Sequence, residues 1–114
     1  MIDCLFCGIS AGEIPATHVH DDETVVAFRD INPQAPTHIL VIPREHIASA
    51  ADLSPEQDDL WAHLLQVALQ LARSEGIDAD GFRIVTNVGR SGGQTVAHLH
   101  LHLLGGRPMT WPPG

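Results

Sequence analysis

The chain contains four segments whose hydrophobic pattern is that of β-strands. Residues 24–29 and 38–43 are rich in β-branched side chains, and residues 82–88 and 96–104 alternate apolar with polar positions. The loop 32–36 holds two prolines and separates the first two of these segments, because neither a helix nor a strand continues through it. We therefore expect two strands, a stiff connection and a later β-hairpin.

Two other segments have the pattern and the end signals of helices. Asp3 is a suitable N-cap for a short helix that ends at Gly12. Ser54 precedes a proline and is followed by Gln57, a capping-box pattern, and apolar positions then repeat at helical spacing until Gly76. This predicts a helix of about 20 residues with one buried face. The order of elements indicates an α+β domain with an antiparallel sheet covered on one face by a helix.

The length of the chain, 114 residues, allows one domain with one modest core. We expect residues 1–104 to form it and residues 105–114, which include three prolines, to be an irregular tail of the same domain. Trp111 in this tail needs an apolar pocket, either in this chain or in a partner subunit.

Charge and composition exclude several classes of function. Lys and Arg number 6 against 14 Asp and Glu, a net charge of -8, so the chain lacks the basic excess that binds a DNA or RNA polymer. The absence of lysine excludes P-loop and Schiff-base chemistry. Neither a secretory signal nor an apolar run of membrane-spanning length is present, which predicts a cytoplasmic protein that does not enter a membrane.

Histidine is the residue type that points to chemistry, with eight in the chain. His98, His100 and His102 alternate with leucines, so on a strand the three imidazoles share one face and the leucines face the core. Two interpretations follow: a metal site built from imidazoles, or nucleophilic attack by an imidazole on phosphorus. We expect His18, His20 and His63 to lie on the solvated surface.

The segment before the histidines favours phosphorus chemistry. Residues 92–95 contain two glycines, whose backbone N–H groups can approach an anion, and the hydroxyl of Thr95. Asn87, across the predicted hairpin, adds a neutral donor. A phosphate group fits such a lining.

Residues 98–104 resemble the signature of the histidine triad (HIT) family, His-φ-His-φ-His-φ-φ with φ apolar, at every position. Further segments resemble the nucleotide-binding Hint branch of that family: 14–16, 28–31, 32–38, 41–43, 46–47, 92–94 and 111–114. The resemblance implies an α+β, HIT-like fold with a five-stranded antiparallel sheet, one long helix and one short helix. It also implies a homodimer in which Trp111 reaches toward the neighbouring site.

The activity that the resemblance implies is that of a purine nucleoside phosphoramidase, or nucleotidyl hydrolase. Such an enzyme cleaves P–N bonds, and acyl adenylates, through a nucleotidyl-histidine intermediate and needs no catalytic metal. By motif match, His100 is the nucleophile, His102 binds the non-bridging oxygens and His98 supports the triad. Thr95, where the family often has Ser, keeps a hydroxyl that protonates a leaving amine.

The same resemblance implies a site for an AMP-type purine nucleotide. Asp30 receives the ribose hydroxyls, apolar residues enclose the purine, and His38 extends the hydrogen-bond network of the triad. The implied nucleotide-binding residues are Phe6, Phe28, Asp30, Ile31, His38, Asn87, Gly93, Gln94 and Thr95. Leu5, Ile9 and Leu40 serve equally well as ordinary core residues or as walls of this site.

Cys4 and Cys7 are a metal half-site, a redox pair or plain thiols rather than a structural disulfide in a reducing compartment. Their spacing on a helix puts both sulfurs on one side, as half of a tetrahedral zinc site requires. In some bacterial-type members of the family, histidines at the positions of His46 and His98 complete such a site. The resemblance thus implies a structural zinc. It also leaves an alternative to the enzyme, namely a non-catalytic nucleotide-binding or scaffold protein with a structural zinc.

Overall fold

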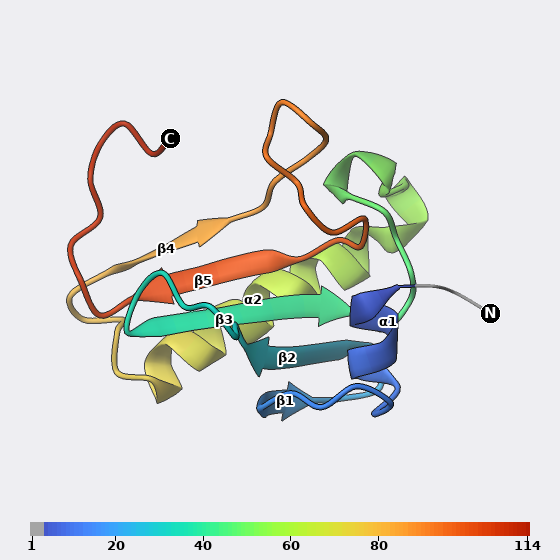
Figure 1. Ribbon diagram of the computed structural model, residues 1–114, viewed down its shortest axis with the longest axis horizontal. Helices are drawn as coiled ribbons and strands as arrows, with labels where there is room; N and C mark the ends of the chain where they lie inside the picture. Colours follow the sequence, from blue (N-terminus) through green and yellow to red (C-terminus); the bar gives the residue numbers. More distant parts are fainter. Residues whose placement is uncertain (1–3) are drawn as a thin grey trace.

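The strands of residues 4–114, which the computed structural model describes, form one antiparallel sheet with the order β1-β2-β3-β5-β4. The expected five-stranded α+β fold is therefore confirmed (Figure 1). The strands are β1 (His18–Asp21), β2 (Val25–Arg29), β3 (Thr37–Pro43), β4 (Phe82–Val85) and β5 (Leu101–Gly105). The helices are α1 (Leu5–Ser10) and α2 (Asp58–Ser74), with 3-10 turns at Ala50–Asp52 and Pro55–Gln57.

The two faces of the sheet are covered unequally. Successive strand residues point to opposite faces, and α2 packs against the face that carries Leu99, Leu101 and Leu103. The leucine side of the histidine segment is thus core, as predicted. The much shorter α1 lies at one end of the other face (Figure 1) and contributes Phe6 and Ile9 to a smaller cluster there.

The long helix begins with the predicted capping box. The Ser54 N–H donates to Gln57 Oε1 at 2.9 Å, and Pro55 follows the cap. The first turn is a 3-10 turn, so the α-helix proper starts at Asp58 and is shorter than expected. Gly76 follows its end with φ +73°, a conformation that favours glycine.

The N-cap of the short helix α1 is Cys4; Asp3, the predicted cap, lies outside the described residues. Cys4 Sγ accepts a hydrogen bond from the Cys7 N–H at 3.5 Å. The helix therefore begins with a potential metal ligand in the capping position.

The edge strand β1 was not predicted, because its sequence is polar. It pairs only with β2, and a strand with one neighbour at the sheet edge needs no apolar run. The sheet therefore begins one strand earlier than residues 24–29, the first strand that the sequence predicts.

The predicted hairpin strands are too long. The first ends at Val85 and the second begins at Leu101, so residues 86–100 form a long connection. Within it, the Leu99 N–H donates to the Ile47 carbonyl at 2.6 Å, which ties this segment to the chain after β3 and not to β4. Gly89 and Gly93 have positive φ and turn the loop away from strand geometry.

Gly105 ends β5, residues 106–114 form no helix or strand, and Trp111 is 83% exposed. Trp111 therefore has no apolar pocket within the described part of this chain. The Arg83 guanidinium donates to the Thr110 carbonyl at 2.8 Å and holds the tail near β4. No helix among residues 4–114 is long and apolar enough to cross a membrane.

Candidate active site and neighbouring metal cluster

The three histidines of residues 98–104 lie in a row on the face that carries α1. His98 and His100 are buried, His102 is half-buried, and the rings of His100 and His102 have centroids 5.0 Å apart. The shared face was predicted from strand alternation. It persists although residues 98–100 precede β5, because Leu99 still anchors the segment in the core under α2.

His100 has one nitrogen fixed by the backbone. Its Nδ1 lies 2.7 Å from the His98 carbonyl oxygen, which can only accept, so Nδ1 carries the proton. The Nε2 nitrogen of a neutral ring then keeps its lone pair. The Phe6 ring packs edge-on against His100 with centroids 5.1 Å apart, which restricts rotation of the imidazole. This is the tautomer that a nucleophilic imidazole requires.

His102 is oriented in the opposite sense by a chain of hydrogen bonds. The Gln34 N–H donates to His38 Nδ1 at 3.0 Å, so the proton of His38 is on Nε2. That nitrogen donates to His102 Nδ1 at 2.9 Å, which leaves the proton of His102 on Nε2 as a free donor. Asp30 Oδ2 lies 3.5 Å from His38 Nε2 and completes the chain. The sequence did not reveal the part played by Gln34, because its contribution is a backbone N–H.

Burial keeps the imidazole rings of His38 and His102 neutral. It lowers the pKa of His102 to about 4, with further lowering by His100 and His38 and a smaller opposing effect of Asp30. Burial also lowers the pKa of His38, against the attraction of Asp30. Both rings are therefore uncharged near neutral pH, as the directed hydrogen bonds require.

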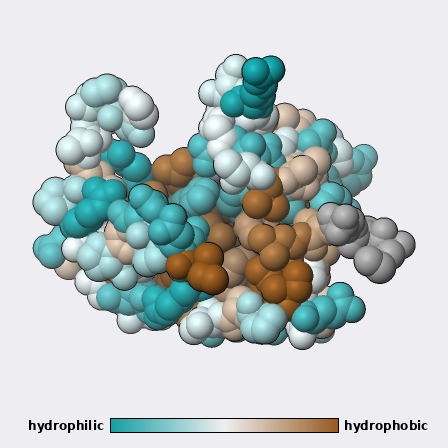
Figure 2. All heavy atoms as spheres, viewed as in Figure 1, coloured by the Kyte–Doolittle hydropathy of each residue, from teal (hydrophilic) through white to brown (hydrophobic). Residues whose placement is uncertain are grey.

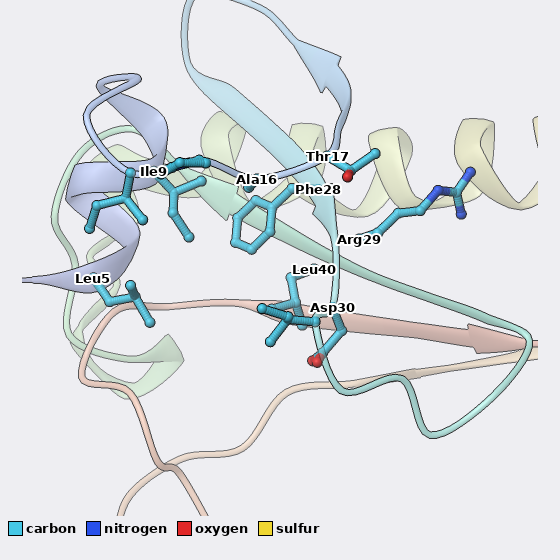
Figure 3. Close-up of a pocket in the computed structure, with 11 residues that line it drawn as sticks. Leu5, Ile9, Ala16, Thr17, Phe28, Arg29, Asp30 and Leu40 are labelled. Carbon is cyan, nitrogen blue, oxygen red and sulfur yellow. The ribbon is translucent and has the colours of Figure 1, made fainter.

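An apolar cavity of about 540 Å³ opens beside this chain of hydrogen bonds. Its walls come from α1, the segment before β1, and strands β2 and β3, and Asp30 stands at its polar end (Figure 3). Hydrophobic side chains gather on the same face in Figure 2. The lining residues are Leu5, Ile9, Ile14, Pro15, Ala16, Thr17, Phe28, Arg29, Asp30, Ile31 and Leu40.

Three predicted wall residues differ in their placement. Phe28 is buried and lines the cavity, whereas Ile31 lines it with a fully exposed side chain. Phe6 does not line the cavity; it packs between Phe28 and His100. Its position makes it a support for both.

A second, more polar cavity of about 350 Å³ includes His38 and His102. Asn87, from the predicted set, lines it as well, together with two arginines that sequence reasoning did not single out, Arg83 and Arg107. These cations gave no signal because they stand outside any motif. Asp30, in the apolar cavity, and His38, in the polar one, are the neighbours that connect the two spaces.

The glycine-containing loop is braced by its own side chains. The Gln94 amide donates to the Ala48 and Val96 carbonyls and accepts from the Gly89 N–H, so all its strong hydrogen-bonding groups are used. The Gly93 N–H likewise donates to the Arg90 carbonyl at 3.1 Å. Thr95 is exposed.

On the α1 side of the triad, Cys4, Cys7, His46 and His98 converge, as predicted. One ligand atom from each lies within 4.8 Å of the others. The Nδ1 of His98 is 3.4 Å from Cys4 Sγ and 3.5 Å from Cys7 Sγ, and His46 Nδ1 is 3.3 Å from Cys7 Sγ. The donor set, two sulfurs and two imidazole nitrogens, is that of a tetrahedral zinc site.

Two features of this cluster fit a bound cation. His98 Nε2 lies 2.8 Å from the Pro43 carbonyl and must carry the proton, so Nδ1 faces the sulfurs as a lone pair. Burial and the neighbouring Cys4 raise the pKa of the Cys7 thiol to about 11. Two adjacent thiolates are thus unfavourable here unless a cation compensates for their charge.

The prediction for the remaining histidines was partly wrong. His18 is exposed, but His20 and His63 both approach the carboxylate of Asp22, at 2.6 and 2.7 Å. The contact of His63 with Asp22 joins residues 41 positions apart, so no local spacing in the sequence reveals it.

Comparisons with known proteins agree with this geometry. The model of the HIT domain family matches residues 11–109. A purine nucleoside phosphoramidase of Escherichia coli is 48% identical over 107 residues, 94% of this chain and 90% of its own length. A 14 kDa zinc-binding protein of Zea mays is 51% identical over 112 residues, 96% of this chain and 87% of its own. The crystal structure of a HIT family hydrolase from Legionella pneumophila has a TM-score of 0.97 and 56% identity, and the match covers 98% of this chain and 100% of that one.

Proposed function

Because the chain belongs to the HIT family, we propose that it is a hydrolase that cleaves the P–N bond of purine nucleoside 5′-phosphoramidates. The observation that carries the proposal is the contact of His100 Nδ1 with the His98 carbonyl at 2.7 Å. This contact fixes the tautomer in which Nε2 is the nucleophile. The name of the Escherichia coli relative supports the choice of substrate.

The reaction takes place in two steps at the α-phosphorus. The lone pair of His100 Nε2 forms a P–N bond, and the bond from phosphorus to the leaving amine breaks with its electron pair on the amine nitrogen. The Thr95 hydroxyl, which is exposed beside the triad segment, protonates that amine. A water molecule then attacks the nucleotidyl-histidine and gives one proton back to Thr95 Oγ1, the P–N bond to His100 breaks with its electron pair on Nε2, and the nucleoside monophosphate is released. An acyl adenylate reacts in the same way, with a carboxylate as leaving group.

His102 stabilises the negative charge on the non-bridging oxygens. Its Nε2–H is the free end of the chain through Gln34 and His38, so it donates without first having to reorient. Asn87 and the backbone at Gly93 and Thr95 assist from the loop, once the Gly93 N–H exchanges its bond to Arg90 for one to the phosphate. His98 takes no part in bond making and holds the carbonyl that orients His100.

The nucleoside occupies the apolar cavity. Phe28 and Ile31, with Leu5, Ile9 and Leu40, enclose the purine, and Asp30 accepts hydrogen bonds from the ribose hydroxyls. Phe6 supports the site from behind Phe28. Gln94 acts through the shape of the loop, since its amide groups are already bonded.

The decisive experiment compares turnover of adenosine 5′-phosphoramidate by the wild type and by His100→Ala, both with EDTA present. We expect kcat to fall by at least about 10⁴-fold in the variant while AMP still binds. Intact-mass analysis should detect an AMP adduct on the wild type only. His18→Ala is the matched control, because His18 is an exposed histidine outside the triad.

Two outcomes contradict the proposal. Turnover in the folded His100→Ala variant removes His100 from the chemistry. A folded wild type that binds AMP but turns over neither the phosphoramidate nor an acyl adenylate is instead a nucleotide-binding or scaffold protein.

A structural zinc accompanies this function. Cys4, Cys7, His46 and His98 would hold it, and its chemistry there is to join α1 to the segments after β3 and before β5. The zinc-binding maize relative supports this assignment. Elemental analysis that finds well under one zinc per chain after expression in zinc-supplemented medium contradicts it.

The functional unit is a homodimer. Trp111 is 83% exposed on a tail that Arg83 holds near the polar cavity, which is the placement expected of a residue that packs against a second subunit. Analytical ultracentrifugation should give a mass about twice 12.3 kDa. A mass near that of one chain contradicts the dimer.

A further inference from the structure

A third group of side chains, away from the triad and the cysteines, brings together His20, Asp22 and His63. They come from three places in the fold: His20 from β1, Asp22 from the turn after it, and His63 from α2. The Nε2 atoms of the two histidines lie 2.6 and 2.7 Å from the same oxygen, Asp22 Oδ2. One ligand atom of each residue lies within 4.8 Å of the others.

The carboxylate is fixed in place before any ligand arrives. Its other oxygen, Oδ1, accepts the N–H groups of Thr24 and Val25 at 2.9 and 2.8 Å, which closes the turn between β1 and β2. Oδ2 is therefore directed at the two imidazoles. Partial burial acts to raise the pKa of Asp22, but the hydrogen bonds from His20, Thr24, His63 and Val25 outweigh it and hold that pKa well below its usual range.

The arrangement is more than a pair of surface contacts. Two imidazoles from separate elements of the fold share one carboxylate oxygen, so the three polar groups converge on one point. Two imidazole nitrogens and one carboxylate oxygen form a ligand set that borderline divalent metal ions prefer.

Solvent access and local charge agree with a cation. The side chains of His20, Asp22 and His63 are 25%, 30% and 43% exposed, so water or an exogenous ligand has room to complete the coordination. The adjacent residues Asp21 and Glu23 are also acidic, and Arg44, which pairs with Asp21, is the cation that contacts this turn. Three acids against one arginine leave the turn negative.

We propose that His20, Asp22 and His63 form a second metal site, which binds a divalent transition-metal ion such as Zn²⁺, Co²⁺ or Ni²⁺ through two imidazoles and one carboxylate. When the ion binds, each ring moves its proton through solvent from Nε2 to Nδ1, so that both Nε2 lone pairs face the ion, which joins the edge strand β1 to α2. The site is separate from the cysteine cluster and from the nucleotide face, since His63 belongs to the helix that covers the opposite face of the sheet.

The test uses the full chain with the cysteine cluster disabled by Cys4→Ser and Cys7→Ser. Zinc is titrated into this protein, freed of metal, against a chromophoric chelator. We expect one zinc per chain, and we expect His20→Ala or His63→Ala each to weaken binding by at least about tenfold, since loss of an outer-shell partner alone costs that much. His18→Ala is the matched control and should leave binding unchanged, because His18 lies on the same strand but outside the group.

Two further measurements keep the test independent of folding defects. Asp22→Asn retains Oδ1 as an acceptor for the turn and removes the charge, so binding should fall while the thermal midpoint stays close to that of the parent. In the wild type, Co²⁺ should fill two sites, and His63→Ala should remove the one whose spectrum lacks thiolate-to-cobalt charge transfer. The cobalt measurement tests the proposal even if the cysteine variant does not fold, because it uses chains that keep both cysteines.

Absence of zinc binding by the folded cysteine variant, with zinc in excess, overturns the proposal; the group is then a hydrogen-bonded clasp between β1 and α2. Binding that survives both histidine substitutions overturns it equally. Neither result bears on phosphoramidate turnover, which does not involve these residues.

Discussion

His98 and His102 occupy the two ends of one alternating segment and face the same way, yet their ring nitrogens are used in opposite senses. The Nε2–H of His98 donates a hydrogen bond to the Pro43 carbonyl, and the Nδ1 lone pair of the same ring faces two sulfurs. His102 accepts at Nδ1 from His38 and keeps a proton on Nε2. The first can ligate a metal, whereas the second can donate to an anion.

The alternation of histidine and leucine does not by itself decide which ring nitrogen of each histidine carries the proton. The partner of the second nitrogen decides it, and that partner comes from a distant segment: Pro43 at the end of β3 for His98, and His38 at its start for His102. His100, between them, has its nitrogen set by the carbonyl of His98. Substitutions at each end should therefore have separable effects.

The largest effect should come from the anion-binding end. His102→Ala removes the oriented Nε2–H donor, and we expect kcat for adenosine 5′-phosphoramidate to fall by about 10²–10³-fold, with a smaller change in KM. Single-turnover measurement of the nucleotidyl-His100 adduct checks the step concerned. A rise in KM of the same size with an unchanged kcat would show that His102 binds the ground state as strongly as the transition state.

A smaller effect should follow at the positioning residue His38. His38→Phe deletes the donor to His102 Nδ1, and we expect a fall in kcat of about tenfold, the value of one hydrogen bond. His38→Gln keeps an N–H at that place and should restore most of the activity. If both substitutions behave alike, the packing of His38 matters and its proton does not.

The protonation of His102 should be visible in stability. Its pKa is about 4 in the folded chain and 6.5 when unperturbed, so between these values the unfolded chain binds more protons and stability falls as the pH falls. The groups facing His102 are His38, His100 and Asp30. Urea unfolding from pH 7 to pH 4 should show a shallower pH dependence in His102→Gln than in the wild type, by up to one proton. Parallel curves for the two proteins would contradict the lowered pKa.

The sequence predicted the parts of the fold that depend on local pattern. The capping box at Ser54, the buried strands and the common face of the three histidines follow from spacing alone. It failed where a tertiary contact overrides the pattern. The alternation of residues 96–100 predicts a strand, but the Leu99 N–H pairs with Ile47, and the polar β1 is a strand only because β2 offers it an edge.

The candidate site shows the same division. The identities of His100, His102 and the four potential zinc ligands came from motif and resemblance. The proton positions of His98 and His102, the support of His100 by Phe6, and the contact of His63 with Asp22 arise between residues that lie 41 to 94 positions apart. No periodicity records such contacts.

The smallest effect on turnover should come from the metal-binding end. Removal of zinc with a chelator, or the substitution Cys4→Ser, should change kcat by less than about twofold, because no atom of the cysteine cluster takes part in bond making. The thermal midpoint should fall instead, since a metal that binds only the folded chain stabilises it, and it should rise again with free zinc concentration. Differential scanning fluorimetry and the phosphoramidate assay on the same samples separate the two quantities.

The link between the two ends is the peptide of His98, whose ring faces the sulfurs and whose carbonyl orients His100. If the metal-binding and anion-binding ends act independently, the buried contact of His98 with Pro43 holds the His98 carbonyl in place without the metal. A loss of turnover larger than about tenfold on chelation, in protein that is still folded, would mean that the metal sets the position of the carbonyl and hence the tautomer of His100. Metal binding and turnover would then be coupled, and the coupling would pass through His98.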